Sequence, residues 1–151
     1  MIFVTVGTTY AFDDLVKAVD EIAPSIKEKI IIQTGTSTYI PQNCEYFHFK
    51  SNLKKYIQKA SIVISHGGAG ASYEILTMGK KLISVENPDV NDSHQWDLLS
   101  TLEEKGYILW CRNLKDLSKQ INKIKKMKFK RYIPPKCEIH RVIQEFLEEK
   151  R

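Results

Sequence analysis

The sequence predicts an α/β fold: a single Rossmann-like domain built on one doubly wound, parallel sheet. Short runs rich in β-branched residues alternate with longer amphipathic stretches, which is typical of βαβ units. Several of the short runs are apolar on both faces, as strands are when helices cover both sides of a parallel sheet. Right-handed crossovers then favour a sheet of about six strands in the order 3-2-1-4-5-6.

Six short runs rich in β-branched or aromatic residues are expected to form the strands. They are residues 2–6, 30–33, 45–49, 62–65, 82–85 and 107–111. Helices are expected between and after them, at residues 12–22, 53–59, 70–78, 95–105, 116–127 and 138–149. Hydrophobic residues recur at helical spacing in the longer of these stretches. Gly79 and Gly106 directly follow two of them, in the position of C-cap residues.

Length and composition limit the class of protein. At 151 residues the chain fits one domain, and a break at Pro134 and Pro135 is expected to separate a body, 1–131, from a terminal helix, 132–151. The sequence shows no signal peptide and no long apolar run, so a cytoplasmic protein is expected. The three cysteines are expected to be free thiols: Cys44, Cys111 and Cys137. The net charge of +5 favours an anionic partner, for which a nucleotide, a nucleic acid or a membrane surface would qualify.

Two glycine-bearing loops follow the first and fourth predicted strands. These strands are neighbours in the expected order, so Gly7-Thr8-Thr9 and the loop from His66 to Gly70 meet at the carboxyl edge of the sheet, where such sheets bind ligands. The second loop opens a helix, whose unpaired amides and positive end would attract a phosphate. Tight packing of strand against helix is the alternative explanation for these glycines.

Three groups near this edge have both a structural and a functional interpretation. Glu74 lies one turn into the helix after the second loop, where it could bind the hydroxyls of a ribose or only favour the helix N-terminus. The polar loop after the fifth strand carries Asp92, His94 and Gln95, which could contact a sugar, while Asp92 could cap the next helix. His66 is a candidate catalytic residue, although a lone histidine is more often structural.

Several common chemistries lack their motifs here. The chain has no Walker lysine, no Ser/His/Asp set and no spacing typical of metal ligands, so neither a metal nor another cofactor is expected. The first loop is Gly-Thr-Thr rather than GxGxxG, and the second strand ends at Gln33 without an acidic residue. Both features argue against NAD binding.

The combination of motifs resembles a known family. The stretch from His66 to Gly106, which begins HGGAGASYEILTMGKKL and includes DSHQWDLL, is similar to the donor-binding region of GT-B glycosyltransferases of the MurG type (family 28, C-terminal domain). The opening IFVTVGTTYAFDDLVKAVD resembles a narrower group, the small catalytic subunits of two-subunit transferases. That group comprises the eukaryotic enzyme that adds the second N-acetylglucosamine to dolichol-linked chitobiose, and bacterial exopolysaccharide counterparts.

The resemblance implies which residues bind the donor. The two glycine loops would lie at the diphosphate, Glu74 at the ribose, Phe49 at the uracil, and the polar pair His94 and Gln95 at the transferred sugar. The substrate-binding residues expected in this way are Gly7, Thr8, Thr9, Phe49, His66, Gly67, Gly68, Ala69, Gly70, Glu74, Asp92, His94 and Gln95.

The resemblance also implies a reaction and partners. A GT-B enzyme closes two Rossmann-like domains over its substrates, and residues 1–131 correspond to the donor half alone. The expected reaction is inverting transfer of a sugar, N-acetylglucosamine above all, from a UDP-sugar to a lipid-linked (polyprenyl or dolichyl diphosphate) acceptor, without a required metal. A membrane-anchored second subunit would supply the acceptor half and hold the protein at the cytosolic membrane face. Galactosyl or glucosyl transfer in exopolysaccharide or capsule synthesis, and a non-enzymatic nucleotide-sugar-binding module, are the alternatives.

A lysine-rich segment near the end of the chain is either a solvated helix face or a surface for anionic headgroups. Its only acidic residue is Asp116. Its basic residues are Lys115, Lys119, Lys123, Lys125, Lys126, Lys128, Lys130 and Arg131. A nucleic-acid partner is not expected, because no aromatic platform interleaves with these lysines.

Overall fold

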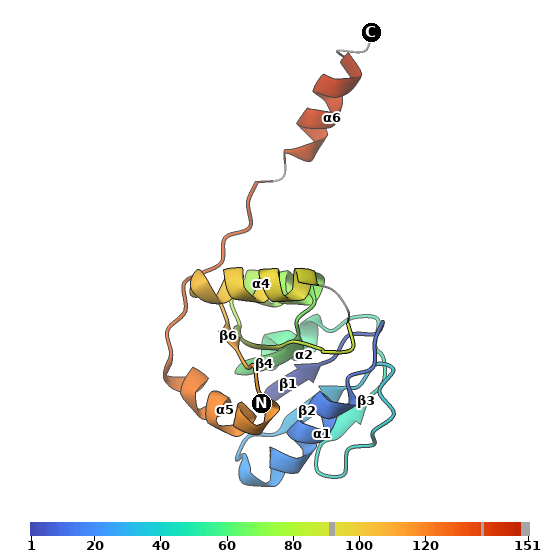
Figure 1. Ribbon diagram of the computed structural model, residues 1–151, viewed down its shortest axis with the longest axis vertical. Helices are drawn as coiled ribbons and strands as arrows, with labels where there is room; N and C mark the ends of the chain where they lie inside the picture. The colour runs from blue at the N-terminus through green and yellow to red at the C-terminus, as the bar shows by residue number, and fades with distance from the viewer. Residues whose placement is uncertain (91–92, 137, 149–151) are drawn as a thin grey trace.

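A parallel sheet lies at the centre of the computed structural model, which describes residues 1–90, 93–136 and 138–148 (Figure 1). Its six strands are β1 (Ile2–Thr5), β2 (Ile30–Gln33), β3 (Glu45–Phe47), β4 (Ile62–His66), β5 (Lys81–Val85) and β6 (Leu109–Trp110). Their order is β3-β2-β1-β4-β5-β6, and every neighbouring pair is parallel. The predicted fold class and strand order are confirmed.

Helices cover both faces of this sheet. One face carries α1 (Asp13–Ile22) and α5 (Leu117–Lys126). The other carries α2 (Lys54–Lys59), α3 (Ala69–Thr77) and α4 (Ser93–Glu104). Two short 3-10 turns, η1 (Ala23–Ser25) and η2 (Leu114–Asp116), follow α1 and precede α5. Within the described ranges, none of the helices is both long and apolar enough to cross a membrane.

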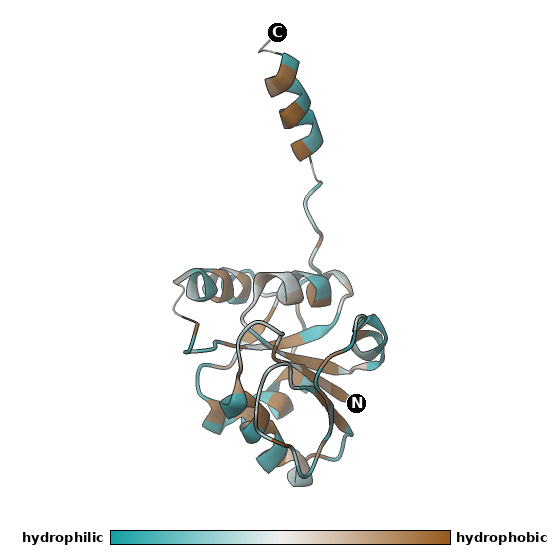
Figure 2. Cartoon of the chain, turned by 90° about the vertical axis from the view of Figure 1, so that its right-hand side faces the viewer, coloured by the Kyte–Doolittle hydropathy of each residue, from teal (hydrophilic) through white to brown (hydrophobic). Residues whose placement is uncertain are grey.

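Alternating side chains along the strands divide the core into two layers. Ile2 and Val4 of β1 are fully buried against the α1 and α5 layer, while Phe3 between them is fully buried on the opposite face. Each such side chain contributes about 1.5–3 kcal/mol through burial. Strands that are buried on both sides therefore need consecutive apolar residues, and Figure 2 shows the strands coloured mainly as hydrophobic between the helices.

Some boundaries differ from the predicted ones. β3 ends at Phe47, two residues earlier than expected, because its partner β2 ends at Gln33 and the chain then turns at Gly35, where φ is +56°. β6 is reduced to Leu109–Trp110 because it is an edge strand that pairs with β5 alone. Phe49 consequently lies beyond the sheet.

The last helix, α6 (Ile139–Glu148), extends away from the body of the protein (Figure 1). None of its described residues belongs to either core layer. Its large apolar side chains are more than half exposed: Ile139, Ile143, Phe146 and Leu147. The sequence predicted this helix, and these four apolar side chains stay largely exposed.

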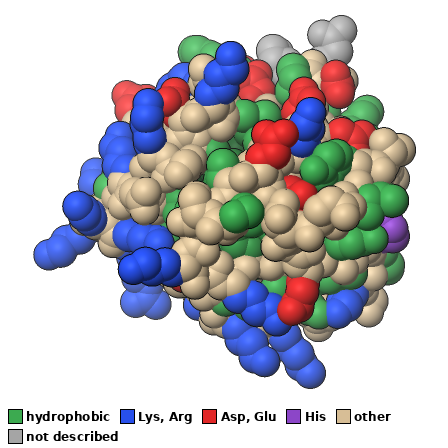
Figure 3. All heavy atoms as spheres, turned by 90° about the horizontal axis from the view of Figure 1, so that it is seen from below, with side chains coloured by type: hydrophobic (Ala, Val, Ile, Leu, Met, Phe, Trp, Pro, Cys, Tyr) green, Lys and Arg blue, Asp and Glu red, His purple; other side chains and the backbone are tan. Residues whose placement is uncertain are grey.

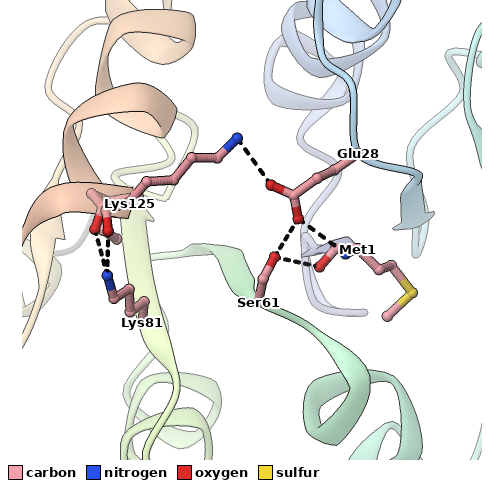
Figure 4. A network of polar contacts seen from close by, with 6 residues as sticks. Met1, Glu28, Ser61, Lys81 and Lys125 are labelled. Carbon is pink, nitrogen blue, oxygen red and sulfur yellow. Dashed lines mark hydrogen bonds and ion pairs between the residues drawn. The ribbon is translucent and has the colours of Figure 1, made fainter.

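A polar network at the amino edge of the sheet centres on Glu28 (Figure 4). Its carboxylate accepts hydrogen bonds from the Ser61 hydroxyl, at 2.5 Å, and from the Met1 amino group, at 3.0 Å. The Lys125 ammonium forms an ion pair with the same carboxylate at 2.9 Å. These contacts, with the Ser61 hydrogen bond as the largest effect, lower the pKa of Glu28 from 4.5 to about 2. The network thus joins β4 and α5 at the edge opposite the glycine loops.

We expect Glu28→Gln to destabilise the protein in a pH-dependent way. Because the folded state lowers this pKa, the carboxylate stabilises the fold fully above pH 4.5, and the contribution is lost as the pH falls toward 2. Partial exposure limits the effect to about 1–2 kcal/mol at neutral pH. Urea unfolding of both proteins from about pH 7 to about pH 3 should show the difference shrinking. A difference that stays constant over this range would mean that the charge of Glu28 does not matter.

Lys80, just before β5, and Lys81, its first residue, bind the C-terminal ends of two helices that lie on opposite faces of the sheet. The Lys80 ammonium donates to the carbonyls of Gln58 and Ala60, at 2.5 and 3.1 Å, at the end of α2. The Lys81 ammonium donates to the last carbonyls of α5, at 2.9 and 2.8 Å (Figure 4). Cations at helix C-termini satisfy carbonyls that lack partners and favour the helix dipole. Lys80 and Lys81 therefore hold α2 and α5 to the same end of β5, at the amino edge of the sheet.

Candidate functional site

A crevice of about 200 Å³ lies at the carboxyl edge of the sheet, where β1 and β4 are neighbours. It is lined by Val6, Thr9, Tyr10, His66, Gly68, Asn87, Val90 and Gln95. The loops after β1, β4 and β5 and the start of α4 all contribute to it. The two glycine loops thus converge as the strand order predicts, while their role in ligand binding stays a prediction.

The imidazole of His66 fills the space between the two glycine loops. A Cβ atom at Gly7 would lie 2.8 Å from the ring Cε1, and one at Gly68 would lie 2.4 Å from Nε2. A Cβ atom at Gly67 would lie 2.9 Å from Oε1 of Gln95 on α4. Close packing within the protein is therefore sufficient to explain the glycines at these three positions.

Gly70 differs from the other glycines of the second loop. A Cβ atom there would meet nothing within 4 Å, and the residue is exposed in the first turn of α3. Alanine would stabilise a helix at such a position by about 0.5–1 kcal/mol over glycine. The packing of the protein gives no reason for a glycine here, whereas the close approach of a ligand does.

The N-terminus of α3 opens at this crevice without a compensating negative charge. Gly68, its N-cap, offers no side-chain hydrogen bond, and its first turn contains no acidic residue. α1 begins at the same edge but carries Asp13 and Asp14 in its first turn. Unpaired amides at a helix N-terminus attract anions. Of these two helices, α3 is consequently the one that fits the predicted phosphate site.

Burial lowers the pKa of His66, and the effect of the Thr5 backbone carbonyl only partly opposes this. The imidazole is consequently neutral at physiological pH. A neutral ring adds no positive charge to attract a phosphate, but it can accept a proton. An attraction for phosphate at the crevice would therefore have to come from the backbone amides of α3.

The buried side chain of Gln33 holds the first glycine loop in place, although Gln33 is not among the predicted site residues. Its Nε2 donates to the Gly7 carbonyl at 3.1 Å and to the His48 carbonyl at 3.3 Å, and its Oε1 accepts from the Thr5 hydroxyl. Gln33 is 1% exposed. The signal in the sequence is a polar residue at the carboxyl end of an apolar strand. When such a side chain is buried, its polar atoms must form hydrogen bonds within the protein.

Asn87, which lines the crevice, similarly holds the loop that follows β5. Its Nδ2 donates to the Ala11 carbonyl at 3.0 Å, and its backbone N–H donates to Oε1 of Gln95 at 3.1 Å. These bonds tie the loop after β5 to the loop before α1 and orient the Gln95 side chain. Tyr10, which also lies outside the predicted set, is 54% exposed at the rim.

Other predicted residues lie outside the crevice. Phe49 is 68% exposed and lines a separate hollow beside Tyr56. Glu74 lies on the exposed side of α3 and lines a third hollow, of about 530 Å³, beside Tyr73. Thr8 and His94 are exposed, Ala69 begins α3, and Asp92 lies outside the described residues. A ligand that touched the crevice, Phe49 and Glu74 would have to be elongated, because they belong to three separate hollows.

The sheet order and the glycine loops at its carboxyl edge define a Rossmann-like domain. The model of the glycosyltransferase family 28 C-terminal domain matches residues 1–147. The chain belongs to this family, and the predicted resemblance is confirmed.

Two curated relatives illustrate the family. The human UDP-N-acetylglucosamine transferase subunit ALG13 is 38% identical over 125 residues, which are 73% of this chain and 11% of the human protein. The UDP-N-acetylglucosamine–N-acetylmuramyl-(pentapeptide) pyrophosphoryl-undecaprenol N-acetylglucosamine transferase of Pelagibacter ubique is 29% identical over 125 residues, which are 75% of this chain and 35% of that protein. The chain thus spans about a tenth of the one relative and a third of the other.

Two solved structures share the fold. The solution structure of ALG13 superposes with a TM-score of 0.62 at 22% identity, over 88% of this chain and 89% of that one. MurG of Acinetobacter baumannii gives a TM-score of 0.61 at 20% identity, over 83% of this chain and 43% of MurG. The fold is therefore that of the C-terminal, Rossmann-like half of a GT-B glycosyltransferase, as predicted.

Proposed function

We propose that this chain is the donor-binding subunit of a glycosyltransferase that moves N-acetylglucosamine from UDP-N-acetylglucosamine to a lipid-linked polyprenyl or dolichyl diphosphate acceptor. The observation that carries the proposal is the uncapped N-terminus of α3, which opens at the crevice in a family 28 domain. The names of the human and Pelagibacter relatives, both N-acetylglucosamine transferases, support the choice of sugar.

In this proposal the donor extends from the crevice along the start of α3. The diphosphate lies on the amides of the first helical turn, next to Gly70, and Glu74 binds the ribose hydroxyls. Phe49 lies against the uracil, and Gln95, with its neighbours His94 and Asp92, contacts the sugar. Negative charge develops on UDP as the glycosidic bond breaks, and fixed amides stabilise it without reorganisation. His66 is the candidate proton acceptor at the crevice floor.

The acceptor half is proposed to come from a second, membrane-anchored subunit. The described strands form one six-stranded sheet, which is a single Rossmann-like unit, and the human relative is named as a subunit. The exposed side chains of Ile139, Ile143 and Leu147 support docking of α6 on such a partner, while Tyr132, before the helix, packs on the body. The complex would thereby lie at the cytosolic face of the membrane.

We expect Gly70→Ala to separate ligand binding from packing. The added methyl group meets no protein atom within 4 Å, so the free energy of unfolding should rise by about 0.5–1 kcal/mol. The same methyl group would stand where the diphosphate approaches the amides, so affinity for UDP should fall. Urea unfolding and calorimetric titration with UDP measure the two effects. A variant that is stabilised and binds UDP as the parent does would place the diphosphate elsewhere.

The function itself is tested by sugar transfer. The chain is combined with the membrane subunit and a lipid-linked acceptor, and supplied with UDP-N-acetylglucosamine, UDP-glucose or UDP-galactose. Selective transfer of N-acetylglucosamine is expected only with both subunits present. Preference for glucose or galactose would favour the exopolysaccharide alternative. Tight binding of a UDP-sugar without transfer to any acceptor would favour the non-enzymatic module.

A further inference from the structure

A basic face lies along the end of α5 and the segment that follows it. The apolar residues of α5, Leu117, Ile121 and Ile124, are fully buried in the core, which directs the lysines of this helix outward. The basic face consists of five exposed residues: Lys123, Lys126, Lys128, Lys130 and Arg131. In Figure 3, Lys and Arg side chains gather along the left of the molecule, the side on which α5 lies in Figure 1.

The charges of this face are not neutralised by the fold. Nearby, Lys119 pairs with Asp116 and Lys125 pairs with Glu28. Across the part of the chain that the structure describes, no ion pair involves any of the five residues of the basic face. Five unpaired cations close together repel one another, and a negatively charged partner relieves that repulsion.

The basic face borders a hollow of about 700 Å³ at the amino edge of the sheet. Its cationic lining residues are Lys80, Lys81, Lys128, Lys130 and Arg131, and none of the described residues that line it is acidic. The ammonium groups of Lys80 and Lys81 already bind helix carbonyls. The charge available to a partner therefore comes from Lys128, Lys130 and Arg131.

The aromatic side chains that line this hollow are engaged within the protein: Tyr107 and Tyr132 contact each other, and Phe129 packs against the core layer of α5. The ring of Tyr132 contacts Tyr73 at 5.5 Å and Tyr107 at 5.4 Å between centroids. Unstacked nucleic-acid bases need free aromatic faces, and these rings offer little such surface. Aromatic side chains beside lysines are, in contrast, suited to the interface between headgroups and acyl chains of a bilayer.

We propose that the basic face binds the anionic headgroups of a phospholipid bilayer directly. It lies at the amino edge of the sheet, whereas the crevice lies at the carboxyl edge, so a bound membrane leaves the crevice accessible. This contact does not depend on the identity of the donor or on a partner subunit. Clustered Lys and Arg residues near an anionic bilayer add their attractions, which salt weakens.

The test is sedimentation of the whole chain with vesicles of phosphatidylcholine alone or mixed with phosphatidylserine. We expect binding to the mixed vesicles only, and weaker binding as salt is added. The triple variant Lys126→Gln/Lys128→Gln/Arg131→Gln should lower the partition constant roughly 100-fold. The control Lys17→Gln/Lys27→Gln/Lys59→Gln removes the same charge from exposed positions outside the basic face, and should lower it far less.

Three outcomes would overturn the proposal. They are equal binding to neutral vesicles, equal losses in the two triple variants, and tighter binding to single-stranded RNA than to phosphatidylserine vesicles at the same salt concentration. UDP titration of the first variant keeps this test separate from the donor site, because the substituted residues do not line the crevice. Unfolding by urea verifies that both variants are folded.

Discussion

Replacing Glu74 with alanine is expected to weaken UDP binding about 10- to 100-fold while leaving the fold intact. A carboxylate that accepts hydrogen bonds from both ribose hydroxyls contributes about 1.5–3 kcal/mol. The side chain is exposed, and its carboxylate makes no hydrogen bond or ion pair with the described residues. The free energy of unfolding should therefore change by less than about 0.5 kcal/mol. Calorimetric titration with UDP and urea unfolding measure the two quantities.

Two further variants sharpen this experiment. Glu74→Gln keeps the shape of the side chain and loses its charge, so its affinity for UDP should lie between those of the parent and Glu74→Ala. Glu104→Ala removes an exposed carboxylate from the far end of α4, and should leave UDP affinity unchanged. If Glu74→Ala binds UDP as tightly as Glu104→Ala does, Glu74 does not bind the ribose.

Gly35→Ala is expected to lower the free energy of unfolding by about 2–5 kcal/mol. Gly35 has a φ of +56°, which costs an alanine about 1–2 kcal/mol. In addition, its Cβ atom would lie 2.1 Å from the Gly7 carbonyl oxygen, and forcing the backbone apart costs about 1–3 kcal/mol. That same carbonyl accepts a hydrogen bond from Gln33, so the first glycine loop should shift and UDP affinity should fall as well.

Gly79→Ala is the matched control for this variant. Gly79 has a φ of +69°, but a Cβ atom there would meet nothing within 4 Å. Its cost should be confined to the backbone conformation, about 1–2 kcal/mol, with no effect on UDP binding. Urea unfolding of both variants gives the comparison. Equal losses of stability would mean that the contact between Gly35 and Gly7 does not constrain the loop.

The sheet and the position of the crevice could be predicted from the sequence because both follow from simple rules. Strands buried on both faces, such as Ile2–Thr5, must be continuously apolar, and right-handed crossovers then leave few strand orders. The strand order in turn brings the loops that begin at Gly7 and His66 together. These conclusions need only local patterns and topology.

The packing inside the crevice could not be predicted in this way. Nothing in the sequence indicates that the His66 ring would occupy the space beside Gly7 and Gly68, because that depends on a side-chain rotamer. The same limit applies to the buried amides of Gln33 and Asn87, whose partners are distant backbone carbonyls. Where the sequence left two explanations for a glycine open, geometry accounts for Gly68 by packing, whereas ligand approach at Gly70 stays a prediction.

The fastening of both helix layers by Lys80 and Lys81 has a mechanical consequence. Together with the Glu28 network, it joins the two helix layers at the amino edge. At the carboxyl edge the bonds of Asn87 join the loop before α1 to α4, but the N-terminus of α3 has no side-chain cap. The largest motion is therefore expected at the start of α3, beside the crevice. Hydrogen exchange should accordingly be slower at the start of β5 than in the first turn of α3, and occupancy of the crevice should slow the latter.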